Sequence, residues 1–193
     1  MESICIVNGR PQNLELHQER MCFTAAHHGF SAPQLPDIAT ILPEHLSRGR
    51  VKWRIQYKEE IQDMEFNPYR PKTIASLQLV EGDPDYRFKY ADRRELELLL
   101  LQKGACDEIL VVRNGFITDT SYSNVVLQQG EHLFTPSTCL LKGTRRQQLL
   151  REGIITEKEI PAAELQNYDH ILLINAMLDI NQAPRIPISN ICG

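Results

Sequence analysis

The chain has 193 residues, enough for one large domain or two small ones, and 42% of them are hydrophobic, as in an ordinary soluble globular protein. Its 21 basic and 25 acidic residues give a net charge of −4, which argues against a protein that binds nucleic acid or an anionic membrane. No wholly apolar stretch is longer than that at 98–101, far short of the roughly 20 residues that a bilayer requires, and the N-terminus shows no secretory signal.

Alternating apolar residues predict a first strand at 2–7, which the turn signal Asn8-Gly9 ends. Asn13 is predicted to cap a helix that continues to about residue 28. The other elements expected in this half of the chain are a helix at 37–46, broken or kinked by Pro43, and strands at 51–57, 61–66 and 73–80.

Residues 81–85 are turn formers and acids, and they are the best candidate for a linker. The elements expected after it are a helix at 92–103, strands at 108–112, 116–118, 124–128 and 132–135, a helix at 143–153 and a strand at 171–174. The sequence therefore predicts an α+β fold of two domains, at 1–84 and 85–193.

The cysteines do not form the even, dense set of a disulfide framework, and the six histidines form no metal-ligand pattern with them. We therefore expect a cytoplasmic protein with reduced thiols and no metal site. The cysteines are Cys5, Cys22, Cys106, Cys139 and Cys192.

Lys89 lies just after the linker and just before a helix, where two domains would meet and where ligand sites are common. Its neighbours Phe88 and Tyr90 can exclude water from the amine, which would lower its pKa and make it a nucleophile or a base. The alternative is an ordinary surface lysine in a turn.

Two polar segments follow along the chain. Asp119 to Asn124 place a carboxylate, several hydroxyls and an amide between two strands, which is either a polar hairpin connection or a site where the acid fixes a basic ring nitrogen. Gly143, Thr144 and Arg145 open a helix, which is either simply capped or an anion site formed by free N–H groups and arginine. Asn175 ends a buried strand, where it is either a strand terminus or part of a site.

In this order, the motifs resemble those of the class IV aminotransferase family, the fold-type IV pyridoxal-phosphate (PLP) enzymes. The family has a Schiff-base lysine shortly before an Asn-Arg or Asn-Tyr that opens a helix, and Lys89-Tyr-Ala-Asp92-Arg93 is similar, with Asp92 in place of Asn. Its Gly-x-(Ile/Val)-(Thr/Ser)-Glu-x4-Asn pattern resembles residues 115–124, with Asp119 in place of Glu.

The resemblance extends over nearly the whole chain. Thr135-Pro136 and the segment 143–146 are similar to the family's Thr-Pro and Gly-Ile-Thr-Arg, while Glu2-Ser3-Ile4 and His17-Gln-Glu-Arg20-Met21 look like its Glu-(Gly/Thr/Ser)-Ile strand and His-x-x-Arg-Leu helix. The resemblance implies an α+β, two-domain fold of the D-amino-acid aminotransferase type, with a shortened N-terminal domain.

The resemblance also implies roles for individual residues. PLP would be bound as an imine to Lys89, and Asp119 would hold its pyridinium, which makes the ring an electron sink. The cofactor-binding residues would be Arg20, Arg93, Asp119, Asn124, Gly143, Thr144 and Arg145. The candidate substrate-binding residues are Ser3, Arg54, Tyr57, Tyr69 and Asn175, of which Arg54 faces either a cleft or water.

Three functions remain open. Asn175 and Arg93 make the chain most similar to 4-amino-4-deoxychorismate lyases, which would release pyruvate and form 4-aminobenzoate. The alternatives are an aminotransferase acting on branched-chain or D-amino acids and a non-catalytic relative, against which the retained Lys89, Asp119 and Arg20 argue. The family's site is completed at a dimer interface, so the resemblance implies a homodimer.

Overall fold

The structure is a computed structural model that describes residues 1–193, and it consists of two compact units. Unit 1 contains residues 1–71 and 88–91, and unit 2 contains residues 72–87 and 92–193. This division differs from the predicted boundary at residue 84. Residues 72–84 belong to unit 2 because strand β5 (Leu77–Glu81) pairs in parallel with β6 (Glu108–Arg113), whereas the short segment that contains Lys89 belongs to unit 1.

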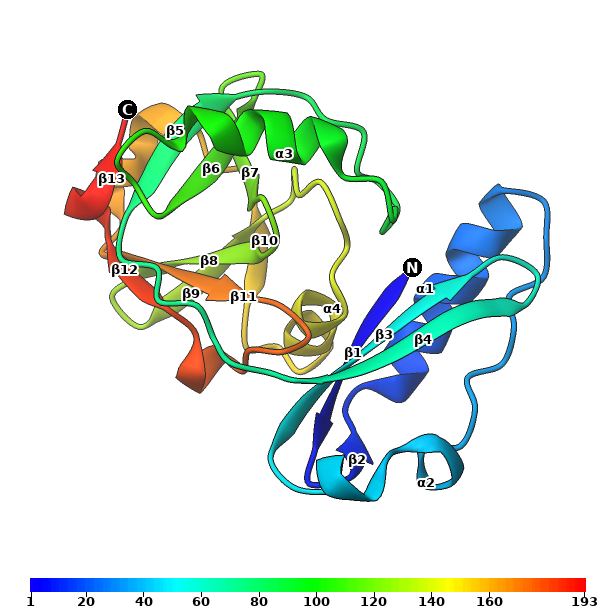
Figure 1. The fold of residues 1–193 in the computed structure, drawn as a ribbon. Helices are drawn as coiled ribbons and strands as arrows, with labels where there is room; N and C mark the ends of the chain where they lie inside the picture. Colours follow the sequence, from blue (N-terminus) through cyan, green and yellow to red (C-terminus); the bar gives the residue numbers. More distant parts are fainter. The chain divides into compact units, whose positions relative to one another are not determined.

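Unit 1 is built on an antiparallel sheet in the order β2-β1-β3-β4 (Figure 1). The strands are β1 (Glu2–Val7), β2 (Arg10–Pro11), β3 (Arg50–Tyr57) and β4 (Ile61–Pro68). Alternate residues of β1 and β3 are fully buried in one apolar core, in which Ile4, Trp53 and Ile55 have no exposed surface. The predicted strands at 2–7 and 51–57 are confirmed by this pairing.

Helix α1 (Leu14–His27) has buried residues four apart, at His17, Met21 and Ala25, and these share one face of the helix. Asn13 is the N-cap residue, as predicted, at a left-handed φ of 54°, but its side chain makes no capping hydrogen bond. Asparagine tolerates this conformation, which is the role it has here. The predicted turn at Asn8-Gly9 is confirmed, with φ of 48° and 78°.

The helix predicted at 37–46 is instead two short pieces, α2 (Ile38–Ile41) and a 3-10 turn, η1 (Glu44–Leu46). Pro43 separates them because it lacks the N–H that a continuous helix needs at this position.

Unit 2 contains a nine-stranded sheet in the order β10-β9-β8-β7-β6-β5-β13, and β11 joins β8 and β12. Its remaining strands are β7 (Phe116–Thr120), β8 (Asn124–Gln129), β9 (His132–Pro136), β10 (Thr156–Lys158), β11 (His170–Ile174), β12 (Arg185–Pro187) and β13 (Ile191–Cys192). Both faces of β8 and β11 are buried: Val125 and Leu173 lie in one core, and Val126 and Leu172 lie in another.

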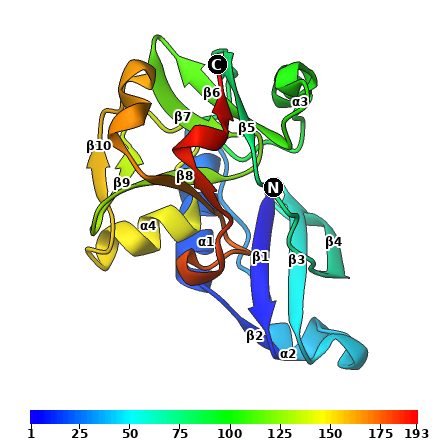
Figure 2. The same ribbon diagram turned by 90° about the vertical axis from the view of Figure 1, so that its left-hand side faces the viewer.

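The helices of unit 2 begin and end close to the predicted positions. They are α3 (Arg94–Leu100), extended by the 3-10 turn η2 (Leu101–Lys103), and α4 (Thr144–Arg151), with shorter 3-10 turns η3 (Ala162–Asn167), η4 (Ile180–Gln182) and η5 (Ile188–Asn190). Leu149 of α4 packs in the same core as Val126 of β8, and α4 is seen beside the strands of its unit in Figure 2.

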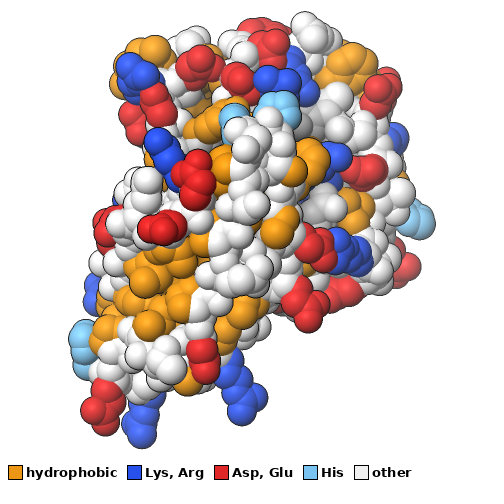
Figure 3. Space-filling view, turned by 90° about the vertical axis from the view of Figure 1, so that its right-hand side faces the viewer, with side chains coloured by type: hydrophobic (Ala, Val, Ile, Leu, Met, Phe, Trp, Pro, Cys, Tyr) orange, Lys and Arg blue, Asp and Glu red, His pale blue; other side chains and the backbone are white.

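The helices are all too short or too polar to cross a membrane. Lys and Arg side chains lie interspersed with Asp and Glu in the view of Figure 3, in keeping with the nearly balanced charge of the sequence.

Candidate active site

A buried acid–base cluster joins β1 to α1 in unit 1. Glu2 has no exposed surface, and its carboxylate accepts hydrogen bonds from Arg20 Nε at 2.9 Å and from Arg20 Nη2 at 2.5 Å. His17 Nδ1 lies 2.6 Å from Glu2 Oε2. Because residues three apart share a helix face, α1 presents His17 and Arg20 together to the strand. We call Glu2, His17 and Arg20 the acid–base cluster.

The charges of the acid–base cluster are fixed by burial and by pairing. Burial alone would raise the pKa of Glu2, but the Arg20 charge and the hydrogen bond with His17 hold that pKa well below its usual value. Burial lowers the pKa of His17 and outweighs the opposing pull of Glu2. The cluster at neutral pH is therefore an ionised Glu2, a charged Arg20 and a neutral imidazole that donates its Nδ1 proton to Glu2.

Lys89 lies close to this cluster, although it is far from it in the sequence. Residues 88–91 pack with unit 1, and the positive charge of Lys89 is one of the lesser causes, after burial, that lower the pKa of His17. Unit 1 therefore brings together Lys89 and Arg20, which was predicted to bind the cofactor, around a carboxylate and an imidazole.

The candidate substrate residues of unit 1 fall into two groups. Ser3 and Arg54 are directly opposite each other on β1 and β3, and Arg54 Nη1 lies 3.9 Å from Glu65 Oε2. Tyr57 instead faces α1, where burial, together with the charge of Glu2, raises its pKa to about 12 despite a hydrogen bond with Thr24.

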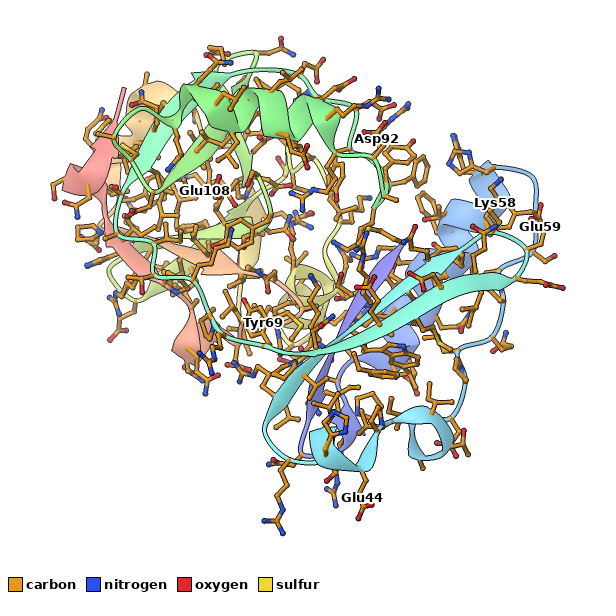
Figure 4. All side chains as sticks on the ribbon, in the orientation of Figure 1. Glu44, Lys58, Glu59, Tyr69, Asp92 and Glu108 are labelled. Carbon is orange, nitrogen blue, oxygen red and sulfur yellow. The ribbon has the colours of Figure 1, made fainter.

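Tyr69 follows β4, as Figure 4 shows, and its N–H donates to Arg50 O at 2.8 Å. Burial raises the pKa of its phenol. The charge of Arg50 opposes this shift, and together with the backbone hydrogen bond to Arg50 it places Tyr69 beside β3.

Asp119, at the end of β7, is the centre of the candidate site in unit 2. It is buried, and its Oδ2 accepts the backbone N–H groups of Leu140 at 2.8 Å and Leu141 at 3.0 Å. Its Oδ1 accepts from Asn124 Nδ2 at 2.8 Å. Burial raises the pKa of Asp119 to about 6, against the lowering effect of these three donors.

Asn124 connects Asp119 to the start of α4. Its Nδ2 also donates to Leu141 O at 2.8 Å, and its Oδ1 occupies the space that a Cβ on Gly143 would need. Both amide hydrogens of Asn124 are thus used within the protein. The residue predicted to bind the cofactor orients Asp119 and the loop before α4, and the absence of a side chain at Gly143 makes that close approach possible.

The first turn of α4 contains buried hydrogen-bond donors that favour an anion. Thr144 and Arg145 are both buried, and Arg145 Nη1 donates to Gln148 Oε1 at 2.6 Å and lies 3.4 Å from Asp179 Oδ2. Arg145 Nε is buried and makes no hydrogen bond. The N-terminus of a helix, with its free N–H groups, attracts negative charge, and the unused Nε adds a further donor.

Arg93 and Asn175 hold the loop between Asp119 and Asn124. Arg93 Nη2 donates to Ser121 O, and Asn175 Nδ2 donates to Ser123 Oγ at 2.9 Å while its Oδ1 accepts from Met177 N–H at 2.8 Å. Arg93 Nε, like that of Arg145, is buried without a hydrogen bond.

Sequence reasoning missed two buried charged residues of unit 2. Arg146 has no exposed surface and donates to Pro136 O at 2.9 Å and to Glu157 Oε1 at 2.5 Å. Glu108, labelled in Figure 4, accepts from Ser121 Oγ at 3.0 Å and so supports the same loop as Arg93. Arg146 lies in the segment 143–146 that resembles a family motif, but no role was predicted for it, and Glu108 lies in no motif.

Asp92, which stands where the family pattern has Asn, is exposed and lies just before the start of α3 (Figure 4). Its Oδ1 accepts from the backbone N–H of Arg94 at 3.0 Å. Either Asp or Asn can make this contact, since both offer an oxygen acceptor at that atom. No group of three or more His, Cys, Asp or Glu side chains could hold a metal ion.

The chain, with its two sheets, has the fold of fold-type IV PLP-dependent enzymes. Lys89 beside the acid–base cluster in unit 1 and Asp119 near the start of α4 in unit 2 agree with that fold. Comparison with protein families agrees: the model of the "Amino-transferase class IV" family matches residues 1–186. The chain belongs to this family, whose members are PLP-dependent enzymes.

Three known proteins are similar to the chain over most of its length. It is 38% identical over 180 residues to an uncharacterised protein of Haemophilus influenzae, covering 91% of this chain and 96% of that protein. It is 34% identical, with a TM-score of 0.82, to a crystal structure described as a putative 4-amino-4-deoxychorismate lyase from Haemophilus somnus, covering 91% and 94% of the two chains. It is 28% identical to a protein of Schizosaccharomyces pombe described as a putative aminodeoxychorismate lyase, covering 84% and 79%.

Proposed function

We propose that the chain is a PLP-dependent lyase that releases pyruvate from 4-amino-4-deoxychorismate and forms 4-aminobenzoate, a folate precursor. The observation that carries this proposal is the convergence of Lys89 and Arg20 on one buried acid–base cluster. The likeness to a crystal structure described as a putative 4-amino-4-deoxychorismate lyase supports the lyase over the aminotransferase.

The residues of unit 2 fit the two ends of the cofactor. A carboxylate has about four lone-pair positions, and Asp119 uses three of them for Asn124 and two backbone amides, so one remains for the N–H of a pyridinium. The unused Nε donor of Arg145, at the start of α4, suits a phosphate. A positive ring nitrogen beside Asp119 would also oppose the effect of burial on its pKa.

When bound, PLP supplies an aldehyde that combines with amines and a ring that takes up electrons from the substrate carbon. Lys89 would hold the cofactor covalently until substrate replaces it, and its freed amine would then remove the proton from the substrate's α-carbon. The same amine would return a proton to the departing pyruvate enol. Arg20, aligned by Glu2, would bind phosphate, and Asp119 would keep the ring nitrogen protonated.

An aminotransferase would use the same residues, with Lys89 moving a proton from the substrate's α-carbon to the cofactor while a keto acid leaves. The two reactions are distinguished by the co-substrate. Pyruvate release from aminodeoxychorismate without any keto acid supports the lyase, and a requirement for 2-oxoglutarate or pyruvate as acceptor supports the aminotransferase.

The test compares the purified wild type with Lys89→Ala and with Lys58→Ala, in which an exposed lysine of unit 1 is removed instead. PLP addition should give wild type and Lys58→Ala a visible absorbance that borohydride abolishes, together with pyruvate release, and Lys89→Ala should show neither. Equal activity of Lys89→Ala and wild type would refute the proposal, and the absence of the absorbance from all three would favour a non-catalytic relative. We expect the enzyme in the cytoplasm, where its five free thiols stay reduced.

A further inference from the structure

The residues on either side of Lys89 are anchored to the C-terminal end of α1 by their rings. The Phe88 ring lies 4.6 Å from that of His27, 5.2 Å from that of His28 and 5.8 Å from that of Phe23, measured between centroids. Tyr90 lies 6.0 Å from Phe88 and 6.3 Å from His28. We call these five residues the aromatic clamp.

Phe88 is the centre of the aromatic clamp. Its ring contacts four other rings of the clamp and is buried, with 5% of its surface exposed, whereas Phe23 is 65% exposed. Removing the Phe88 ring therefore removes most contacts of the clamp, while removing the Phe23 ring removes one peripheral contact.

The backbone at Lys89 forms a tight turn. Tyr90 N–H donates to Phe88 O at 2.9 Å, a hydrogen bond that spans three residues with Lys89 in the middle. Lys89 is not among the residues with positive φ, so this is an inverse γ-turn. Such a turn has one internal hydrogen bond, which water can replace, so its persistence depends on contacts outside the turn. These are the packing of the flanking rings and the hydrogen bond that Lys89 O accepts from the Met1 amine at 2.9 Å.

Helix α1 contributes residues to both the aromatic clamp and the acid–base cluster. His27 is seven residues after Arg20, a separation of about 10 Å along a helix that rises 1.5 Å per residue. A lysine anchored at the clamp therefore lies within about two helical turns of Arg20, which agrees with the influence of its charge on His17.

We propose that Phe88 is the positioning residue for Lys89, because its ring docks on α1 and fixes the turn from which the amine extends to the acid–base cluster. The proposal rests on the proposed function, in which Lys89 binds PLP. Phe88 does not touch the reacting atoms, so its effect is on where the amine lies and not on the chemistry of the amine itself.

The experiment measures which lysine reacts with PLP. Wild type, Phe88→Ala, Phe88→Leu and the control Phe23→Ala are incubated with PLP, reduced with borohydride and digested, and the labelled fraction of Lys89 is compared with that of exposed Lys58 by mass spectrometry. Trp53 fluorescence verifies that unit 1 is folded in each variant, because this tryptophan is fully buried in its core.

We expect Phe88→Ala to lower Lys89 labelling at least tenfold without changing that of Lys58, Phe88→Leu to restore most of it, and Phe23→Ala to behave as wild type. Where turnover is measured, kcat should fall in Phe88→Ala with KM little changed. If Phe88→Ala does not fold, Phe88→Leu with a native Trp53 spectrum must still show a measurable loss of Lys89 labelling.

Equal Lys89 labelling in wild type and a folded Phe88 variant would overturn the positioning role and leave the proposed function intact. An equal loss of Lys89 labelling in Phe23→Ala would also overturn it, since removal of any apolar ring near this end of α1 would then have the same effect. Wild type that labels Lys89 no better than Lys58 would instead overturn the proposed function, and the positioning role with it.

Discussion

Replacing Glu2 with Gln tests the acid–base cluster with the least change of shape. Gln keeps the size of the side chain but removes the charge that pairs with Arg20, and it brings an NH2 group against donors of Arg20 or His17. Arg20 remains buried to the same extent, with 12% of its side chain exposed. Breaking one partner of a buried, hydrogen-bonded ion pair costs about 3–5 kcal/mol of unfolding free energy.

Glu65→Gln is the matched control in the same unit. Glu65 faces Arg54 at 3.9 Å with 46% of its side chain exposed, and exposed pairs of this kind contribute about 0–1 kcal/mol. Urea unfolding is followed by the fluorescence of Trp53, the single tryptophan of the chain, which lies fully buried in the core of unit 1. A cost for Glu2→Gln no larger than that for Glu65→Gln would refute the reasoning.

The pH dependence of the same experiment follows from the two shifted pKa values. The folded pKa of Glu2 is depressed, so its stabilisation is present above its ordinary pKa of 4.5 and is lost as the pH falls below that value. The folded pKa of His17 is lowered from 6.5, so the unfolded state binds its proton first and stability also falls as the pH drops through about 6.5. Unit 1 of wild type should therefore weaken steadily on acidification, and the difference from Glu2→Gln should narrow below about pH 4.5.

Three further predictions concern unit 2 and assembly. Gly143→Ala should cost about 1–3 kcal/mol in urea unfolding, because its Cβ would collide with Asn124 Oδ1, and in an Asn124→Ala background the same change should cost much less. PLP affinity, measured by absorbance titration, should rise in wild type relative to Asp119→Asn as the pH passes upward through about 6, where Asp119 ionises; parallel curves for the two proteins would contradict this. Light scattering should give twice the 22.2 kDa chain mass if the chain is a homodimer, as its resemblance to the family implies, and the mass of one chain would exclude it.

The longer strands were predictable because each is long enough to show a pattern of apolar residues. In β3 one face is buried, and the resulting alternation can be seen in the sequence. In β1 residues 2–6 are all buried, and Ile4 and Ile6 alternate with smaller residues. Both strands were predicted to within one residue of their ends. The strands β10, β12 and β13 were missed because each has only two or three residues, too few for any period to show. Their pairing partners, such as β5 for β13, are supplied by tertiary structure alone.

The site was predictable in its residue types but not in its contacts. Asp119 and Asn124 were found because their spacing resembles a family motif, yet the donors that hold Asp119 also include the backbone N–H groups of Leu140 and Leu141. A backbone N–H has the same chemistry at every residue except proline, so no sequence signal marks these two. The assignment of residues 88–91 to unit 1 was missed for a related reason, since it depends on rings that meet across more than 60 positions of the chain.

These backbone donors also explain why an aspartate stands where the family pattern has glutamate. Oδ2 of Asp119 receives two adjacent amides, and Oδ1 receives the amide of an Asn124 that is itself held against Gly143. An added methylene would move the carboxylate by about one bond length beyond Cγ, and hydrogen bonds of 2.8–3.0 Å do not survive a displacement of that size without movement of the loop. The loop before α4 is thus built for the shorter acid, so Asp119→Glu should bind PLP more weakly than wild type even though it restores the family residue.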